Sequence, residues 1–518
     1  MKKLPLGIQT FSKIVDLNCV YVDKTKQIYS LVSGTQGDYF FLSRPRRFGK
    51  SLLLSTLKEI FLGSKHLFNG LWIAQSDYSW VQFPVIYLDF STISSRTTSQ
   101  LESGIIQSLK DTAQMYGKDI GSVTTPEEAL KNLVRELSLL GKIVVLIDEY
   151  DKPILDHIAE PTLSQAHQEI LRSFYAAIKA ADAYLRFIFM TGVTKFSKTS
   201  VFSGLNNLKD LTLNSEASAL LGYTDEEVTQ YFDQHINHIV SKQQLTTTQL
   251  RENIRLWYNG YQFSREPLKV YNPYSVLLYL SSGELLNYWF ETGTPSFLVQ
   301  LISFRKYPVE AIDQAELSVL DMGSFDIDNI DITLLLLQTG YLTIKSYNEQ
   351  TRNYQLDYPN EETKISFLYY FVNSLTNAPI SLLSNNIFKL TQALRNNNLS
   401  LFFSTLEIFF AAIPYNVQLA QEKYYQSIFY VIVSLIGAYV HAEVVTNEGR
   451  IDATIETNYH IYIFEFKLNQ SAASALQQIE DKRYYQKYLH SNKSIVLVGA
   501  NFSFDKRNIQ EWLVKVLD

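Results

Sequence analysis

The stretch from Tyr39 to Leu54 constrains the fold most, because it joins a short apolar run to the tripeptide Gly49-Lys50-Ser51. The run YFFL is typical of a buried strand, and the apolar periodicity that begins at Ser51 predicts a helix. A strand, a tight turn and a helix in this order direct backbone N–H groups and a helix N-terminus at one anion. Lys50 would then reach the β- and γ-phosphates of a nucleotide, and the Ser51 hydroxyl would bind Mg²⁺.

The match to a glycine-rich phosphate loop is incomplete. The motif G-x-x-x-x-G-K-[ST] requires its first glycine at position 44, where this chain has Arg44, followed by Pro45, Arg46 and Arg47. An ordinary strand-to-helix turn is therefore the alternative interpretation. If the loop binds phosphate, we expect the three arginines to shield it and to replace with side chains part of what backbone N–H groups supply.

A buried strand that ends in acidic residues supports the nucleotide interpretation. Ile143 to Ile147 is a continuous branched apolar run, which predicts a strand covered on both faces of a parallel sheet. Asp148 and Glu149 fall at its carboxyl end, where ligands bind in open α/β sheets. In a P-loop NTPase, Asp148 would hold Mg²⁺ and Glu149 would polarise the attacking water. The alternative is that both carboxylates only cap the next segment.

The first domain, residues 1–220, is expected to be a P-loop ATPase, an α/β fold with helices on both faces of a parallel sheet. Further strands are expected at Phe83–Phe90, Tyr184–Val193 and Leu211–Asn214, and helices at Thr25–Leu31, Ser51–Phe61, Gln100–Met115 and Pro126–Leu140. Thr191 and Thr194 stand at the end of one strand and are candidates for sensing the γ-phosphate. A plain turn is the alternative there.

A mostly helical region follows the first domain. Thr224 stands three residues before Glu227, as in a capping box. A helix and two short strands are expected at Ile332–Gln338, Tyr341–Tyr347 and Asn353–Tyr358. We therefore expect a helical lid with a winged-helix-like module over residues 221–375 and a helical linker over residues 376–414. A winged module can bind DNA, but it also serves as a packing unit.

A second group of candidate functional residues lies near the C-terminus. Two alternating stretches predict a hairpin with its turn at Asn458 and Tyr459. In that register, Asp452 pairs directly with Glu465, and such like charges destabilise a hairpin unless a cation lies between them. Strand alternation places Lys467 on the same face as Glu465. The alternative is a solvated strand face with one ion pair.

Two carboxylates and a lysine suit a hard cation such as Mg²⁺ or Mn²⁺, and Lys467 would orient or activate water for phosphodiester hydrolysis. An apolar helix that begins at Glu422 could carry a further acidic ligand to the metal. A helix over Leu476–Tyr488 and a closing strand over Ser494–Val498 complete a small restriction-endonuclease-like α/β domain over residues 415–518. The helix offers polar side chains to a phosphate backbone: Gln478, Lys482, Arg483 and Lys487.

The amino-acid composition limits which cellular compartment and which binding partners we expect. The single cysteine, Cys19, excludes an intramolecular disulfide and a cysteine-rich zinc site, which fits a reducing compartment. The sequence has neither a signal peptide nor a run of about 18 apolar residues, so we expect a cytoplasmic protein without membrane contact. A net charge of −6 argues against an extended basic surface, although a local basic patch would not show in the sum.

Taken together, several stretches resemble AAA-ATPase-like proteins that carry a C-terminal PD-(D/E)XK nuclease domain. They are YVDKT at Tyr21, RPRRFGKS at Arg44, IDEYDKP at Ile147, TGVTKFSK at Thr191, FSGLNNL at Phe202, GRID at Gly449 and FEFK at Phe464. The resemblance spans nearly the whole chain, and it implies that Arg44 in place of glycine is a family trait. It also implies nucleotide binding by a loop of Arg47, Phe48, Gly49, Lys50 and Ser51, Walker B roles for Asp148 and Glu149, and a nuclease site of Asp452, Glu465 and Lys467.

The sequence thus predicts an ATP-binding protein whose nucleotide state controls a metal-dependent nuclease. Nucleic acid is the expected partner, with DNA favoured over RNA, and homo-oligomers are a further expectation. The alternative is a nucleotide-dependent switch or scaffold whose nuclease-like domain binds nucleic acid or a protein without cutting. A third interpretation is a stand-alone ATPase with a decayed effector domain.

Overall fold

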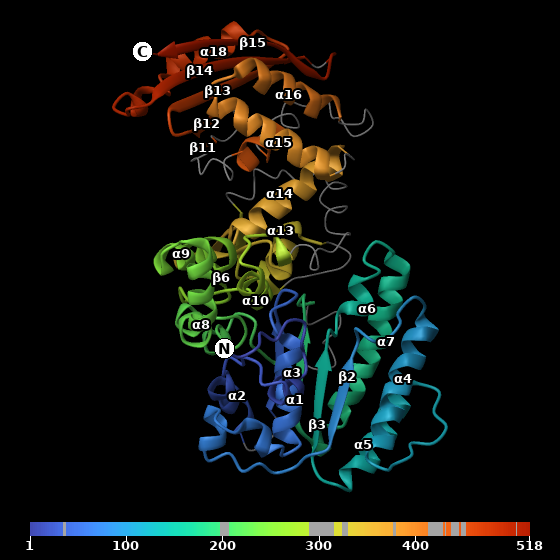
Figure 1. The fold of residues 1–518 in the computed structure, drawn as a ribbon. Helices are drawn as coiled ribbons and strands as arrows, with labels where there is room; N and C mark the ends of the chain where they lie inside the picture. The colour runs from blue at the N-terminus through green and yellow to red at the C-terminus, as the bar shows by residue number, and fades with distance from the viewer. Residues whose placement is uncertain are drawn as a thin grey trace. The chain divides into compact units, whose positions relative to one another are not determined.

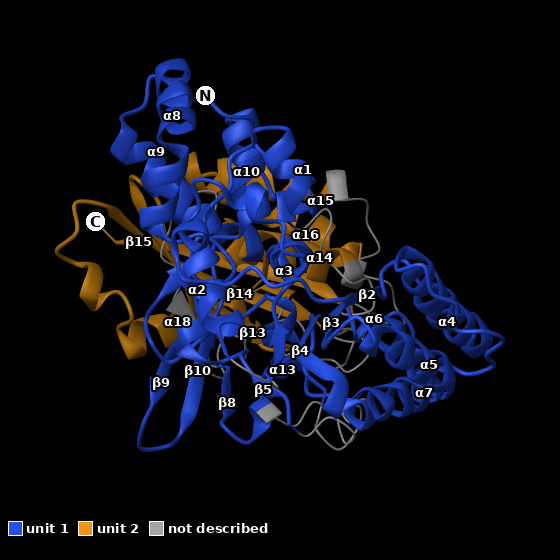
Figure 2. Cartoon of the chain, turned by 90° about the horizontal axis from the view of Figure 1, so that it is seen from below, with its two compact units in different colours: residues 1–297, 314–363 blue, residues 298–313, 364–518 orange. Residues whose placement is uncertain are grey.

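The computed structural model divides into two compact units (Figures 1 and 2). It describes residues 1–34, 38–196, 207–289, 315–323, 330–376, 380–412, 428–429, 431–436, 445–446, 452–503 and 505–517. Unit 1 comprises Met1–Phe297 and Gln314–Thr363, and unit 2 comprises Leu298–Asp313 and Lys364–Asp518. Among the described residues, no helix combines the length and apolar character needed to cross a membrane. The finer domain boundaries expected at residues 220, 375 and 414 stay predictions.

Unit 1 is built on a five-stranded parallel sheet in the order β2-β3-β4-β1-β5. Its strands are β1 (Asp38–Ser43), β2 (Val85–Asp89), β3 (Ile143–Asp148), β4 (Leu185–Gly192) and β5 (Lys209–Asp210). The apolar runs of β1, β3 and β4 are buried almost throughout, as expected for strands covered on both faces. Because β4 lies between β1 and β3, the ends of the two strands that carry the predicted nucleotide residues both border β4.

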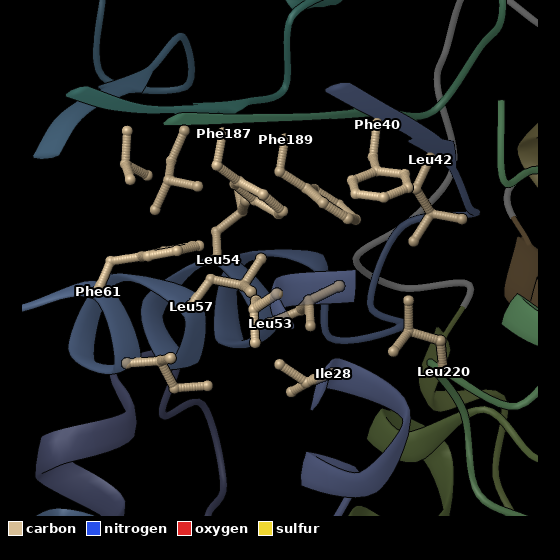
Figure 3. Packing of buried hydrophobic residues seen from close by; sticks show 14 of the residues in the cluster. Ile28, Phe40, Leu42, Leu53, Leu54, Leu57, Phe61, Phe187, Phe189 and Leu220 are labelled. Atoms are coloured by element: carbon tan, nitrogen blue, oxygen red, sulfur yellow. The ribbon is translucent and has the colours of Figure 1, made fainter. Parts of the chain in front are cut away.

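Helices cover both faces of this sheet (Figure 1). They are α1 (Phe11–Asp16), α2 (Thr25–Val32), α3 (Lys50–Phe61), α4 (Thr98–Met115), α5 (Pro126–Ser138), α6 (Lys152–Leu155) and α7 (Pro161–Ala180). On one face, Leu54 and Leu57 of α3 pack under Phe187 and Phe189 of β4 (Figure 3). The helices α4, α5 and α7 contact one another on the opposite face. The predicted α/β fold is therefore confirmed.

Unit 1 also differs from the sequence prediction. The strand expected at Leu211–Asn214 is wrong, because β5 is Lys209–Asp210 and the buried Leu211 follows it as an anchor in the core. The helix α7 was not predicted, although Leu171, Phe174 and Ile178 recur at helical spacing on its buried side.

The remainder of unit 1 is mainly helical. It contains α8 (Asp225–Gln243), α9 (Thr247–Tyr258), β6 (Tyr261–Gln262), β7 (Lys269–Val270), α10 (Pro273–Ser282), β8 (Glu316–Ser318), α13 (Ile332–Thr339), β9 (Thr343–Asn348) and β10 (Asn353–Asp357). The capping box of Thr224 and Glu227 is confirmed. The helix and two strands expected at 332–358 are present, but β8 adds an unpredicted strand in the order β8-β10-β9.

Unit 2 contains a mixed sheet in the order β11-β12-β13-β14-β15, in which only β13 and β14 are parallel. Its strands are β11 (Val445–Thr446), β12 (Asp452–Glu456), β13 (His460–Leu468), β14 (Ser494–Ser503) and β15 (Asn508–Leu517). Its helices are α14 (Glu361–Thr376, which begins in unit 1), α15 (Ile380–Arg395), α16 (Leu399–Ala411) and α18 (Ala472–Lys482). The helix expected at Leu476–Tyr488 was misplaced, because α18 begins at Ala472 and ends at Lys482, where the following residue, Arg483, has a left-handed conformation. The strand β15 was not predicted.

Candidate functional site

The loop between β1 and α3 carries the predicted phosphate-binding residues. Gly49 caps α3 with a φ of 92°, a left-handed conformation that favours glycine. Arg47 is also left-handed, with a φ of 67°. These two residues turn the chain so that α3 begins at Lys50, and Ser51 lies half-buried in its first turn. The local order is the one that an anion site at a helix N-terminus requires.

Lys50 is held inside this loop by backbone oxygens. It is 5% exposed, and its ammonium donates to the carbonyl oxygens of Arg44 at 2.9 Å and Pro45 at 3.0 Å. Burial lowers the pKa of Lys50, and the negative charges of Glu149 and Asp148 oppose that shift. A phosphate oxygen would therefore meet an ammonium whose present partners are neutral.

Arg44 makes structural contacts that a glycine could not make. It is 1% exposed, and its guanidinium stacks over the ring of Phe263 at 4.1 Å. The guanidinium donates to the carbonyl oxygens of Ser43 at 2.8 Å, Thr212 at 2.8 Å and Ala217 at 3.1 Å. Burial lowers its pKa to about 9. These contacts argue against the expectation that Arg44 shields phosphates.

The other loop residues separate into two groups. Phe48 is buried, with its ring 4.7 Å from that of Tyr261, so any contact of Phe48 with a nucleotide would have to use its backbone. Arg47 is exposed, with its guanidinium 5.1 Å from the Tyr274 ring. Arg46 is half-buried, and its positive charge is among the causes that lower the pKa of Lys50. Of the three arginines, Arg46 is thus the one placed to act on the site.

Asp148 and Glu149 lie at the end of β3, as predicted. Asp148 is buried, and its carboxylate accepts a hydrogen bond of 2.5 Å from the Thr191 hydroxyl at the end of β4. Glu149 has a φ of 50°, a strained conformation of the kind that gathers at functional sites. Burial raises the pKa of Glu149, whereas Lys50 opposes the shift. A carboxylate with a raised pKa suits a general base.

Thr194 contacts a different carboxylate, which the sequence prediction missed. The buried Asp151 accepts hydrogen bonds from the Val193 N–H at 3.0 Å, the Thr194 N–H at 2.6 Å and the Thr194 hydroxyl at 2.7 Å. Burial raises the pKa of Asp151. A Cβ at Gly192 would stand 2.7 Å from its carboxylate, so the turn needs glycine there. Thr194 therefore fastens the end of β4 to the segment after β3, and the available sequence signal was the third acidic residue of IDEYD.

An apolar pocket opens beside Gly49, and the sequence prediction did not identify it. It holds roughly 550 Å³ of empty space, including the part open to solvent. The N-terminal segment, α3 and the segment before α8 line it with, among others, Val20, Val22, Ile28, Leu52, Leu53, Leu221 and Tyr223. Lys24 also borders it, with its ammonium donating to Glu227 at 2.6 Å and to the Ala219 carbonyl at 2.8 Å. In the sequence, the YVDKT stretch was the feature that could have indicated this pocket.

The second candidate site lies on the C-terminal hairpin. The predicted register is confirmed, because Asp452 pairs with Glu465 across β12 and β13. The Lys467 ammonium donates to Glu465 Oε1 at 3.0 Å and to Gln478 Oε1 on α18 at 2.5 Å. On the other face of β13, the Phe464 ring lies 5.5 Å from that of Phe402. The strand thus has one polar and one apolar face, as alternation requires.

Glu465 provides a test of the predicted metal site. It is 1% exposed, and its second oxygen, Oε2, has no hydrogen-bond partner among the described residues. Leaving a buried carboxylate oxygen unpaired costs free energy, and a divalent cation would supply the missing partner. Glu465 therefore fits a metal.

The remaining predicted ligands are not described. Glu422, residues 449–451 and the side chain of Asp452 lie outside the described part of the chain. Among the described side chains, no group of three or more His, Cys, Asp or Glu residues could hold a metal ion.

Comparisons with known proteins identify the families of the two regions that carry these candidate sites. Residues 5–202 match a family model described as predicted AAA-ATPase, and residues 420–512 match one of the PD-(D/E)XK nuclease superfamily. An uncharacterized protein in the vnfD 5′ region of Azotobacter chroococcum mcd 1 is 39% identical over 534 residues, which cover 100% of this chain and 99% of that protein. The Aeropyrum pernix ORC1 protein in complex with DNA is 10% identical over 69% of this chain and 92% of its own, with a TM-score of 0.26. So low a score carries no argument.

Proposed function

Because this chain belongs to the family of predicted AAA-ATPases with a C-terminal PD-(D/E)XK nuclease superfamily domain, we propose that it is a nucleotide-controlled nuclease. It binds ATP at the loop between β1 and α3, and it hydrolyses phosphodiester bonds in nucleic acid at Glu465 and Lys467. The observation that carries this proposal is the buried Oε2 of Glu465, which has no hydrogen-bond partner among the residues that the structure describes and lies in the same carboxylate that pairs with the Lys467 ammonium.

The nucleotide half of the proposal assigns a part to each side chain. Lys50 exchanges its neutral carbonyl partners for the β- and γ-phosphates, which gains a charge-assisted hydrogen bond. Asp148 and Ser51 hold Mg²⁺, and Thr191 fixes the Asp148 carboxylate. Glu149 orients the attacking water. The apolar pocket beside Gly49 takes the base, since such pockets favour flat apolar rings.

The nuclease half rests on one strand face. Glu465 and Asp452, with Glu422 as a further ligand, would hold Mg²⁺ or Mn²⁺, which polarises a scissile phosphate and lowers the pKa of water. Lys467 keeps its ammonium at the Glu465 carboxylate, where it can hold a water or a phosphate oxygen. Gln478 fixes the lysine from α18. DNA is the favoured substrate over RNA. A winged-helix-like module, homo-oligomers and a cytoplasmic location complete the proposal from the sequence alone.

The test is a cleavage panel on single- and double-stranded DNA and RNA, with and without ATP, in Mg²⁺ or Mn²⁺. We expect Lys467→Ala to lower cleavage by about 100-fold or more, since it removes a group that handles a proton or charge at the reacting phosphate. Lys50→Ala should abolish only the effect of ATP on cleavage. The matched control is Lys493→Ala, which removes a lysine that pairs with Glu456 at 2.6 Å elsewhere on the same sheet. Cleavage that survives Lys467→Ala would contradict the proposal.

A non-cleaving switch or scaffold is the second candidate function. The net charge of −6 favours it, because it argues against an extended basic surface. It predicts nucleic-acid binding that weakens steeply with salt, without any cleavage in the same panel.

A further inference from the structure

The phosphate loop is attached to parts of unit 1 that lie far from it in sequence. The carbonyl oxygen of Arg46 accepts a hydrogen bond of 3.0 Å from the indole N–H of Trp289. The preceding residue, Pro45, packs against Gly340 at the end of α13, where an added Cβ would stand 2.7 Å from the proline ring. The loop that would receive phosphate is therefore in direct contact with two later segments.

Trp289 continues this connection to a buried carboxyl group. The tryptophan is 0% exposed, and its backbone N–H donates to Glu362 at 2.7 Å. Glu362 is also 0% exposed and accepts from the Ser275 hydroxyl at 2.8 Å and 3.1 Å. The Trp289 ring lies 5.2 Å from that of Tyr341. One continuous chain of contacts thus runs from Arg46 through Trp289 to Glu362.

Both residues stand where the chain passes from one unit to the other. The chain enters unit 2 after Phe297 and again after Thr363. Trp289 precedes the first of these points, and Glu362 precedes the second. Glu362 lies in the first turn of α14, which runs on to Thr376. Whatever moves Glu362 therefore acts on a helix that continues into unit 2.

We propose that Trp289 and Glu362 are positioning residues that couple occupancy of the phosphate loop to the stability of α14. This inference rests on the proposed ATP binding. Phosphate would draw the Lys50 ammonium away from the carbonyl oxygens of Arg44 and Pro45. The loop backbone would then change its conformation. The next carbonyl group along the loop, that of Arg46, accepts the hydrogen bond from Trp289, and this bond would transmit the change to Glu362.

The protonation state of the buried Glu362 carboxyl group suggests a conservative substitution. Burial raises its pKa to about 8, so the carboxyl group is mostly protonated near neutral pH. Glu362→Gln then retains the shape, the charge and the acceptor for the Trp289 N–H. Glu362→Ala removes the acceptor and interrupts the connection.

The experiment measures backbone amide hydrogen exchange in α14 with and without MgATP, together with MgATP affinity by calorimetry, on the full chain. In the wild type we expect MgATP to change exchange in α14 by about five- to tenfold, at the low end of measured couplings. Trp289→Phe keeps the ring but loses the indole N–H, and should remove this change while MgATP affinity falls by no more than about tenfold. The matched control is Trp257→Phe on α9, which should behave like the wild type.

The variants of Glu362 provide a second test of the proposed coupling. Glu362→Gln should keep the MgATP-dependent exchange and Glu362→Ala should lose it, which holds even if Trp289→Phe does not fold. A wild type that binds MgATP with no change in α14, or a Trp289→Phe protein that keeps the change, would overturn the coupling. Absence of MgATP binding by the wild type would instead overturn the proposed function.

Discussion

Both candidate sites bring a lysine close to carboxylates of a sheet, but the lysines have different partners. Lys50 donates to two neutral carbonyl oxygens of its own loop, while Asp148 and Glu149 act on it only through their field. Lys467 donates directly to the carboxylate of Glu465. Arg46 and the N-terminus of α3 add positive charge at the first site, whereas at the second site one lysine pairs with Glu465, whose backbone partner across the hairpin is Asp452.

This difference tells the two sites apart chemically. An anion at Lys50 would have to displace only neutral partners, so the loop is prepared for phosphate. At Lys467 the ion pair is already formed, and the buried Oε2 of Glu465 has no hydrogen-bond partner within the described part of the chain, which supports the proposal that the hairpin binds a cation. Each of the following substitutions changes one of these two arrangements.

The largest effect is expected from Glu465→Gln. The substitution should lower phosphodiester cleavage about 1000-fold, because loss of a metal ligand removes several kcal/mol of transition-state stabilisation. It should also abolish the rise in melting temperature that Mg²⁺ or Mn²⁺ gives the wild type, while the rise caused by nucleotide persists. Glu456→Gln, which alters the ion pair with Lys493, is the control. A metal-induced rise that survives in Glu465→Gln would mean that this site is not prepared for a cation.

Arg44→Gly should act on stability more than on nucleotide binding. It removes three hydrogen bonds from a buried guanidinium and its contact with Phe263, and we expect a loss of about 3 kcal/mol in the free energy of unfolding. Denaturant unfolding of the apoprotein measures it. The exposed Arg47→Ala should cost less than about 0.5 kcal/mol. If Arg44→Gly instead leaves stability unchanged and weakens MgATP binding, the arginine contacts phosphate after all.

The smallest effect separates two threonines at the end of β4. Thr191→Val and Thr194→Val each remove a hydroxyl that donates to a buried carboxylate, so both should cost about 1–3 kcal/mol of stability. Only Thr191 holds Asp148, the proposed Mg²⁺ ligand. At a temperature where both variants are folded, ATP turnover should fall about tenfold in Thr191→Val and less than about twofold in Thr194→Val. If the two variants lose ATP turnover equally, both threonines would be assigned as residues that sense the γ-phosphate.

The sequence alone determined what depends on neighbouring residues. Apolar runs and their polar ends identified β1, β3 and β4, and Lys50, Asp148 and Glu149 with them. Alternation and the turn at Asn458 determined the register that pairs Asp452 with Glu465, since a shift by one residue would turn every side chain to the other face.

Only the tertiary structure decided what depends on residues far apart in the chain. Arg44 reaches Thr212 and Ala217, Thr194 finds Asp151, and Trp289 connects Arg46 with Glu362. No periodicity records such contacts, because local patterns report which side of an element is buried and not which distant group lies against it. The motif therefore located the phosphate loop, whereas the packing around it shows which of its side chains remain for the phosphate.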